Sequence, residues 1–214
     1  METMFKIKVE NIFNPLNLDE IKKKSKEKIN FEFFDDGFKI INIGRLTDQK
    51  DQITLLKSIN LLRYKINIRL LIIGTGVEEK NLKDYIRKNN LSNCVKIKNF
   101  LDNPYPYILK SDLFILSSKY EGLPNVLLEA AVLKKFIIST DCPTGPKEIL
   151  LNGKGGYLFN VGDYKKLSKL ILIFLKNRNH LKNKINYTYK SLARYDLKRN
   201  LMKYYVLLIP FLRS

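Results

Sequence analysis

The chain has 214 residues, of which 45% are apolar, 11% aromatic and 28% charged. This composition suffices for one packed domain and excludes a disordered tail, a collagen or a coiled coil. Lys and Arg number 39 against 21 Asp and Glu, giving a formal net charge of +18, so polyanions or an anionic membrane surface are candidate partners. The two cysteines, Cys94 and Cys142, lack metal-ligand spacing and are too few for a disulfide scaffold, which favours a reducing, cytoplasmic location.

Charged residues interrupt the N-terminal segment METMFKIKVENIF too early for a signal peptide. The longest apolar runs, 170–175 and 204–212, are shorter than the roughly 20 residues that cross a bilayer. We therefore expect no membrane-spanning helix. The last run is flanked by Lys203 and Arg213 and could lie at a membrane interface, but we favour a helix that packs on the body of the protein.

Short apolar runs alternate with longer stretches of helical character, which predicts a parallel sheet covered by helices. Strands are expected at 39–43, 69–73, 95–97, 113–116 and 136–139, and helices at 51–62, 78–88, 106–110, 124–133 and 146–151. The strands lack polar alternation, which suits burial on both faces. The predicted fold class is α/β, a Rossmann-like doubly wound parallel sheet with a C-terminal helical extension.

These elements divide the chain into three parts. Residues 1–36 hold an Asn-Pro turn signal and a Lys-rich amphipathic stretch at 18–28, which favours a lead-in or linker over a separate domain. Residues 37–176 are the expected Rossmann-like domain, and residues 177–214 are the helical extension. Because ligands bind such sheets outside the carboxyl ends of the strands, the loops after the strands are the candidate site.

After the first strand, the segment GRLTDQK places Arg45 and Lys50 five positions apart on a loop that leads into a helix. A guanidinium binds phosphate oxygens bidentately and an ammonium adds a compact charge. Together they could hold a diphosphate and stabilise negative charge on a departing phosphate. Two solvated surface cations are the alternative.

After the second strand, Gly74-Thr75-Gly76 forms a flexible turn that lets the backbone approach a ligand closely. The third glycine and the later acidic residue of a dinucleotide fingerprint are missing, which argues against NAD binding. An ordinary strand-to-helix turn is the alternative.

After the fourth strand, the segment SSKYEGLPNVLLEA is the most informative. Gly122 frees the backbone and the proline that follows suits a first helical turn, so the N–H groups of Leu123, Asn125 and Val126 could face an anion. Glu121 would lie at the mouth of the loop. The alternative is a capping loop with an ordinary exposed glutamate.

Glu129 lies two helical turns after Glu121 and about 80° around the helix axis. Two carboxylates could therefore reach different hydroxyls of one ligand.

After the fifth strand, Thr144-Gly145-Pro146 indicates a helix start, and Glu148 is as consistent with capping as with ligand binding. The sole histidine, His180, lies beyond the predicted sheet, which argues against Ser-His or Cys-His catalysis and histidine metal sites.

In this order and spacing, the segments resemble the C-terminal, donor-binding half of retaining GT-B glycosyltransferases of the family four group (glycosyl transferases group 1). The match covers roughly residues 14–175. GRLTDQK resembles the family's phosphate-binding loop, LLIIGTG its second strand and turn, and EGLPNVLLE its Glu-x7-Glu motif. STDCPTGPKEIL with NGKGGYLFNVGD resembles the subset that transfers hexoses or N-acetylhexosamines in bacterial surface-polysaccharide assembly, lipopolysaccharide included.

The resemblance implies roles for single residues. Arg45 and Lys50 would hold the diphosphate and stabilise the leaving nucleotide, and Glu121 would contact the donor sugar; these are the implied catalytic residues. Glu129 would bind the ribose, and the backbone from Ile97 to Phe100 the base. The implied donor-binding residues are Gly44, Gly76, Ile97, Phe100, Gly122, Leu123, Asn125, Val126 and Glu129.

The resemblance further implies a UDP-hexose or UDP-N-acetylhexosamine donor, no metal or other cofactor, and front-face retention in which the leaving phosphate helps deprotonate the acceptor. The acceptor would be lipid-linked or a polysaccharide, at the cytoplasmic face of a membrane that the protein contacts peripherally. No nucleic acid partner is expected.

The sequence departs from a complete enzyme of this family. A complete enzyme has an N-terminal acceptor-binding domain, whereas about 35 residues precede the first strand here, and Asn14-Pro15 resembles the linker between the two domains. We therefore expect a fragment, a truncated product or half of a split enzyme that a separate acceptor domain completes. Asn99 also replaces the Gly of many relatives, near the expected base site.

Two other hypotheses stay open from sequence. The high positive charge suits a basic α/β binding module for nucleic acid or an anionic membrane, without catalysis, whose affinity would fall steeply with salt. A degenerate fragment that folds but binds nothing is the third.

Overall fold

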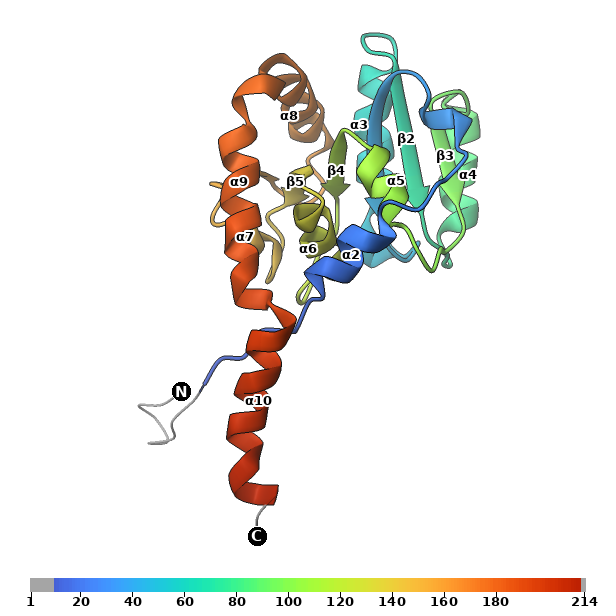
Figure 1. The fold of residues 1–214 in the computed structure, drawn as a ribbon. Coiled ribbons are helices and arrows are strands. Elements are labelled where there is room, and N and C mark those ends of the chain that lie inside the picture. The colour runs from blue at the N-terminus through green and yellow to red at the C-terminus, as the bar shows by residue number, and fades with distance from the viewer. Residues whose placement is uncertain (1–9, 213–214) are drawn as a thin grey trace.

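The computed structural model describes the backbone of residues 10–212 and the side chains of residues 10–209 (Figure 1). A six-stranded sheet has the order β3-β2-β1-β4-β5-β6, and each neighbouring pair is parallel. Its strands are β1 (Phe38–Ile43), β2 (Ile68–Ile73), β3 (Val95–Lys98), β4 (Leu113–Leu116), β5 (Phe136–Thr140) and β6 (Tyr157–Phe159). The Rossmann-like sheet predicted from sequence is confirmed.

Helices flank the sheet on both faces (Figure 1). They are α2 (Leu18–Lys24), α3 (Gln52–Leu62), α4 (Glu79–Lys88), α5 (Tyr105–Lys110), α6 (Asn125–Val132), α7 (Pro146–Ile149), α8 (Tyr164–Asn177), α9 (Lys182–Ser191) and α10 (Leu197–Leu212). Single turns of 3-10 helix are η1 (Glu32–Phe34), η2 (Asp48–Lys50), η3 (Arg178–His180) and η4 (Leu192–Tyr195).

Two apolar cores lie on opposite faces of the sheet because successive side chains of a strand point to opposite faces. Ile40 of β1 belongs to the core that includes Leu55 of α3 and Ile171 of α8. Ile41, the next residue, belongs to the core that includes Leu127 of α6. Burial on both faces is the reason that most residues of the inner strands are apolar, with Lys39 and Asn42 as the exceptions in β1.

The segment before the sheet contributes to the second core. Ile21 of α2 and Phe34 of η1 are 4% and 3% exposed, and the ring of Phe31 packs edge-on against Tyr107 at 5.2 Å. Upstream, the Leu16 N–H donates to the Tyr195 carbonyl at 2.8 Å. The expected lead-in of residues 1–36 is thus packed on the sheet domain from α2 onward.

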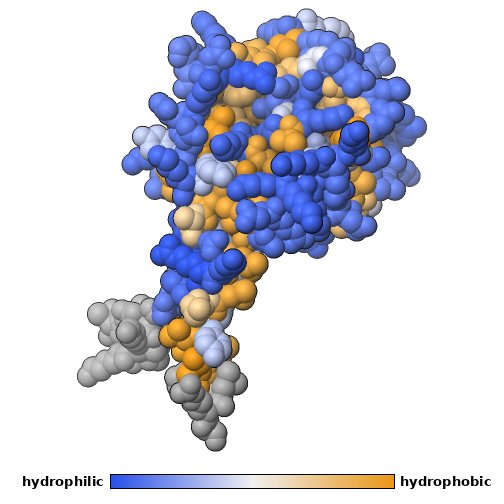
Figure 2. All heavy atoms as spheres, in the orientation of Figure 1, coloured by the Kyte–Doolittle hydropathy of each residue, from blue (hydrophilic) through white to orange (hydrophobic). Residues whose placement is uncertain are grey.

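Helix α10 projects away from the body of the domain (Figure 1). Large side chains are exposed along it, namely Leu201, Met202, Tyr204, Tyr205, Val206, Leu207 and Leu208, and Figure 2 shows hydrophobic residues at the surface of the projecting part beside hydrophilic ones. The expectation that this helix packs on the body is wrong for these side chains. Within residues 10–212, no helix combines the length and the apolarity needed to cross a membrane.

The strand order places one pair of loops at the centre of the ligand-binding edge. The chain builds β1, β2 and β3 outward and then returns to β4 on the other side of β1. Loops diverge at such a switch point and leave a crevice at the carboxyl ends of the strands. The loops after β1 (44–51) and after β4 (117–124) flank this crevice.

Gly145, before α7, supports the second of these loops. Its φ is +73°, and a Cβ there would lie 2.2 Å from the Gly122 carbonyl oxygen and 2.6 Å from Pro124 Cδ. Gly162 has a similar φ of +78° but no atom within 4 Å of the Cβ position. A larger residue at Gly162 would therefore introduce backbone strain without a clash, whereas one at Gly145 would introduce both.

We expect Gly145→Ala to lower the free energy of unfolding by about 2 kcal/mol or more beyond the loss in Gly162→Ala. Both substitutions introduce backbone strain, but only the one at Gly145 also forces a clash. Urea denaturation of both variants measures the difference. Equal losses would show that the contact between the two loops is not tight.

Candidate active site

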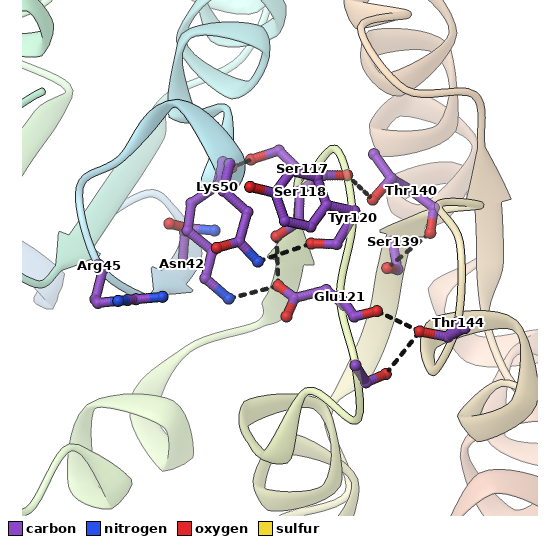
Figure 3. A network of polar contacts seen from close by, with 12 residues as sticks. Asn42, Arg45, Lys50, Ser117, Ser118, Tyr120, Glu121, Ser139, Thr140 and Thr144 are labelled. Atoms are coloured by element: carbon purple, nitrogen blue, oxygen red, sulfur yellow. Dashed lines mark hydrogen bonds and ion pairs between the residues drawn. The ribbon is translucent and has the colours of Figure 1, made fainter.

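The loops after β1 and β4 meet through a half-buried ion pair. The Lys50 Nζ lies 2.5 Å from Glu121 Oε1, and the two side chains are 14% and 7% exposed. The hydroxyl of Ser118 donates to the same carboxylate oxygen at 2.6 Å. Figure 3 shows the three side chains converging at the edge of the sheet. Because Oε1 already accepts two hydrogen bonds, Oε2 is the oxygen that Glu121 can offer to a ligand.

Further hydrogen bonds fasten the two loops to each other. Ser117 Oγ donates to the Lys50 carbonyl at 2.8 Å, and Gln49 Nε2 donates to the Tyr120 carbonyl at 2.9 Å. The backbone N–H of Lys119 donates to the Gln49 carbonyl at 2.8 Å. Lys50 and Glu121 are therefore held by their backbones as well as by their own contact.

The loop after β5 supports Glu121 from the opposite side. The Thr144 hydroxyl donates to the Glu121 carbonyl (Figure 3), and the Glu121 N–H donates to the Pro143 carbonyl at 3.2 Å. Thr140 Oγ1 at the end of β5 donates to the Ser118 carbonyl at 2.7 Å. The carboxylate of Glu121 thus faces Lys50, while its main chain faces the loop after β5.

A cavity of about 330 Å³ lies beside this pair. Its walls come from the ends of β1 and β2, from the loop before α5 and from α6, with Gly44, Arg45, Gly74, Thr75, Phe100 and Glu129 among its lining residues. Arg45 is exposed, and within residues 10–209 its side chain makes no hydrogen bond or ion pair. Its guanidinium is free to bind an anion at this cavity.

Glu129 is one of two acids in the wall of the cavity; the other is Asp102. Burial raises the pKa of Glu129, and a hydrogen bond from Tyr105 partly offsets this. Burial, with the Glu129 charge as a second cause, raises the pKa of Tyr105 to about 12. Tyr105 is therefore protonated near neutral pH and acts as a hydrogen-bond donor to the carboxylate.

The start of α6 is open to a ligand. Its N-cap is Pro124, which supplies no capping side chain, so the first amides, those of Asn125 and Val126, keep their partial positive charge. No atom lies within 4 Å of the Cβ position of Gly122. Val126 lines the cavity, so this helix start lies next to Arg45 and Glu129.

The residues predicted from sequence do not all gather here. Gly44, Arg45, Phe100, Val126 and Glu129 line the one cavity, and Lys50 and Glu121 form the adjoining ion pair. Gly122 and Asn125 lie on the loop and helix start between them.

Three other predicted residues lie apart from the cavity lining. Gly76 packs on the backbone of Leu46, where a Cβ would lie 2.2 Å from its carbonyl oxygen. Ile97 packs against the core formed with α3, α4 and α8 and lines a separate depression with Val95. Leu123 packs into the opposite core.

Three side chains join the site that sequence reasoning did not assign to it: Ser118, Tyr105 and Thr144. The signal for Ser118 is its position, because two serines follow an apolar strand at its carboxyl end, and ligands bind at that edge of such a sheet. Nothing local to Tyr105 indicates its contact with Glu129, which is 24 residues away in the sequence. The assembled site offers two cations, free amides and three acids, Asp102 among them, which suits a ligand that carries both phosphate and hydroxyl groups.

Comparison with known proteins places this geometry in a family. The model of the family Glycosyl transferases group 1 matches residues 23–191. An uncharacterized glycosyltransferase from Methanocaldococcus jannaschii is 41% identical over 143 residues, covering 66% of this chain and 35% of that protein. The N-acetylgalactosamine-N,N'-diacetylbacillosaminyl-diphospho-undecaprenol 4-alpha-N-acetylgalactosaminyltransferase of Campylobacter jejuni is 29% identical over 200 residues, covering 92% of this chain and 53% of that protein.

Solved structures show the same fold. Anabaena HepE in complex with UDP superposes with a TM-score of 0.80 at 18% identity, over 93% of this chain and 57% of that one. A TarM mutant of S. aureus, in complex with Fondaparinux, alpha-GlcNAc-glycerol and UDP, gives a TM-score of 0.76 at 21% identity, over 96% and 41% of the two chains. The chain spans about half or less of the length of these curated relatives. Because the family model matches most of the chain, the chain belongs to the group 1 glycosyltransferases.

Proposed function

We propose that this chain binds a nucleotide sugar and supplies the donor half of a retaining glycosyltransferase. The observation that carries the proposal is the contact between Lys50 and Glu121 at 2.5 Å, next to a cavity lined by Arg45 and Glu129. One ligand with a diphosphate, a sugar and a ribose would meet all four side chains. The UDP in the solved structures of two relatives supports this choice.

In this proposal, Arg45 and Lys50 bind the diphosphate, with the uncapped amides at the start of α6 as further donors. Lys50 has one N–H directed to Glu121 and two left for phosphate oxygens. Glu121 accepts from a donor-sugar hydroxyl through Oε2, and Glu129 accepts from the ribose. The base lies toward Phe100, which is 69% exposed and free to stack.

The proposed transfer retains configuration. The bond between the anomeric carbon and the diphosphate oxygen breaks, and the acceptor oxygen bonds to the same face of the sugar. The acceptor proton passes to the leaving phosphate oxygen, so the chain itself supplies no nucleophile. Arg45 and Lys50 stabilise the charge that builds on the leaving group, and the proposal assigns no step to a metal ion or another cofactor.

We propose a UDP-hexose or UDP-N-acetylhexosamine as donor and a lipid-linked or polysaccharide acceptor. The printed name of the Campylobacter relative, an N-acetylgalactosaminyltransferase that acts on a diphospho-undecaprenol, supports both, and a lipid acceptor would bring the protein to the surface of a membrane. Because the relatives extend well beyond the region matched, we assign donor binding to this chain and transfer to an assembly that includes an acceptor domain.

The first prediction concerns the two cations. We expect Arg45→Ala with Lys50→Ala to weaken UDP binding at least tenfold, because each charge-assisted hydrogen bond contributes about 1.5–3 kcal/mol. Isothermal titration calorimetry measures the affinity. Lys119→Ala is the control, since Lys119 lies on the loop after β4 but pairs with Asp48.

Undiminished UDP binding by the double variant would contradict the proposal, and so would the absence of UDP binding by the wild type. Tight binding of duplex DNA near physiological salt, without UDP binding, would instead favour the basic binding module.

The second prediction concerns Glu129. Its raised pKa means that the native state binds this proton more tightly than the unfolded chain does, so this group's contribution to stability is present below the ordinary pKa and is lost as pH rises through the raised value. We expect Glu129→Gln to unfold at a higher urea concentration than the wild type at pH 8. This advantage should shrink toward pH 4, where the wild-type acid is protonated too.

The same substitution should weaken UDP binding, because an amide accepts less strongly than a carboxylate from the ribose. A variant that is both less stable at pH 8 and unchanged in UDP affinity would show that Glu129 is a structural residue.

The third prediction separates the sugar from the nucleotide. Ser118→Ala removes one of the two donors to Glu121 Oε1, so we expect weaker binding of UDP-sugar and unchanged binding of UDP. Ser58→Ala is the matched control, because Ser58 is equally buried and donates to the Leu55 carbonyl at 2.7 Å. Parallel losses for UDP and UDP-sugar in Ser118→Ala would mean that Ser118 only maintains the loop.

A further inference from the structure

A second, larger cleft lies on the other side of Glu121 and shares Thr144 with the site described above. Its volume is about 700 Å³, and it is bounded by the loop after β5, by α7, by the turn after α7 and by η4. Its polar lining consists of Asp141, Thr144, Lys147, Glu148, Asn152 and Arg194. We call this space the α7 cleft.

The α7 cleft adjoins the residue proposed to hold the donor sugar. Thr144, which lines the cleft, donates its hydroxyl to the Glu121 carbonyl. Figure 3 shows Thr144 and Lys50 on opposite sides of Glu121. A group bound in the cleft would therefore lie next to the donor sugar and on the side away from the ion pair.

The charges that line the α7 cleft balance one another. Lys147 Nζ lies 3.3 Å from the Asp141 carboxylate, and Arg194 lies 3.3 Å from the Glu148 carboxylate. Two cations and two acids leave no local excess of positive charge, which disfavours a phosphate. Carboxylates, an amide, a hydroxyl and cationic N–H groups together provide both donors and acceptors, the combination that sugar hydroxyls need.

The lining is also shaped by unusual backbone geometry. Thr144, Leu151 and Asn152 line the cleft and have φ values of 54°, 52° and 54°. Non-glycine residues rarely adopt this left-handed conformation, and such residues cluster at ligand sites. Arg194 is fixed by a second contact, in which Nη2 donates to the Glu148 carbonyl at 2.9 Å.

We propose that the α7 cleft binds a neutral saccharide, namely the glycan part of the acceptor, beside the donor sugar. The inference rests on the proposed function, which places the donor sugar at Glu121. A cleft of this volume falls in the range of small-molecule sites and accommodates more than one sugar ring. Part of the acceptor site thus lies on the donor-binding chain.

An NMR titration of the ¹⁵N-labelled chain tests this. The probes are N-acetylgalactosamine and maltose, each raised to about 50 mM so that binding with a Kd of about 1 mM, which is only about 4 kcal/mol, would reach saturation, with inorganic phosphate as a third probe. At least one saccharide should shift the amides of residues 141–153 saturably, whether or not UDP is present, and phosphate should not.

Lys147→Ala with Asn152→Gly should abolish these shifts while UDP still binds. Glycine at 152 keeps the left-handed backbone and removes only the side-chain amide. Lys154→Ala is the control, because Lys154 is exposed close to the cleft but does not line it, and it should leave the saccharide shifts unchanged.

The proposal is overturned if neither saccharide shifts these amides, if the double variant responds like the wild type, or if phosphate competes with the saccharide. UDP added to the same sample should shift the amides of Gly44 and Val126. Failure of that response, with saccharide binding intact, would refute the proposed donor function and leave the saccharide site standing.

Discussion

The site depends on the ion pair between Lys50 and Glu121. Removing two charges from water is costly, and a half-buried pair is stable here because its partners are close and Ser118 supplies a further hydrogen bond to the carboxylate. The pair joins loops from β1 and β4 at the switch point of the sheet. The proposed binding of phosphate and sugar uses a cation and an acid close together, and the pair keeps both in place.

The parallel sheet explains why such a pair forms at this edge. Its strands are buried on both faces and end together, so the polar groups that can meet a ligand come from the loops after the strands and from the helices that follow those loops. Hydrogen bonds from the loop after β1 on one side, and from the end of β5 and the loop after it on the other side, hold Glu121 between Lys50 and Thr144. This arrangement gives the residue two distinct sides, one toward the donor cavity and one toward the α7 cleft.

Burial and ionisation oppose each other at Glu129. A carboxylate in the wall of a cavity is penalised by burial, and Tyr105 offsets part of that penalty. The exposed apolar side chains of α10 are also unfavourable for folding, because water contacts them in this chain. Both are features that folding alone does not require, whereas the paired cores on the two faces of the sheet are what stabilise the domain.

The sequence by itself determined the sheet, because short, mostly apolar runs and the helices between them leave few other arrangements. It also determined that Arg45, Lys50, Glu121 and Glu129 follow strand ends. Tertiary structure decided which of these residues lie together. The ion pair joins positions 71 residues apart, and Tyr105 of α5 lies near Glu129 of α6. It also placed Ile97 against the core and left α10 projecting from the body. Local pattern specifies each segment, but contacts between distant segments depend on how the whole sheet is packed.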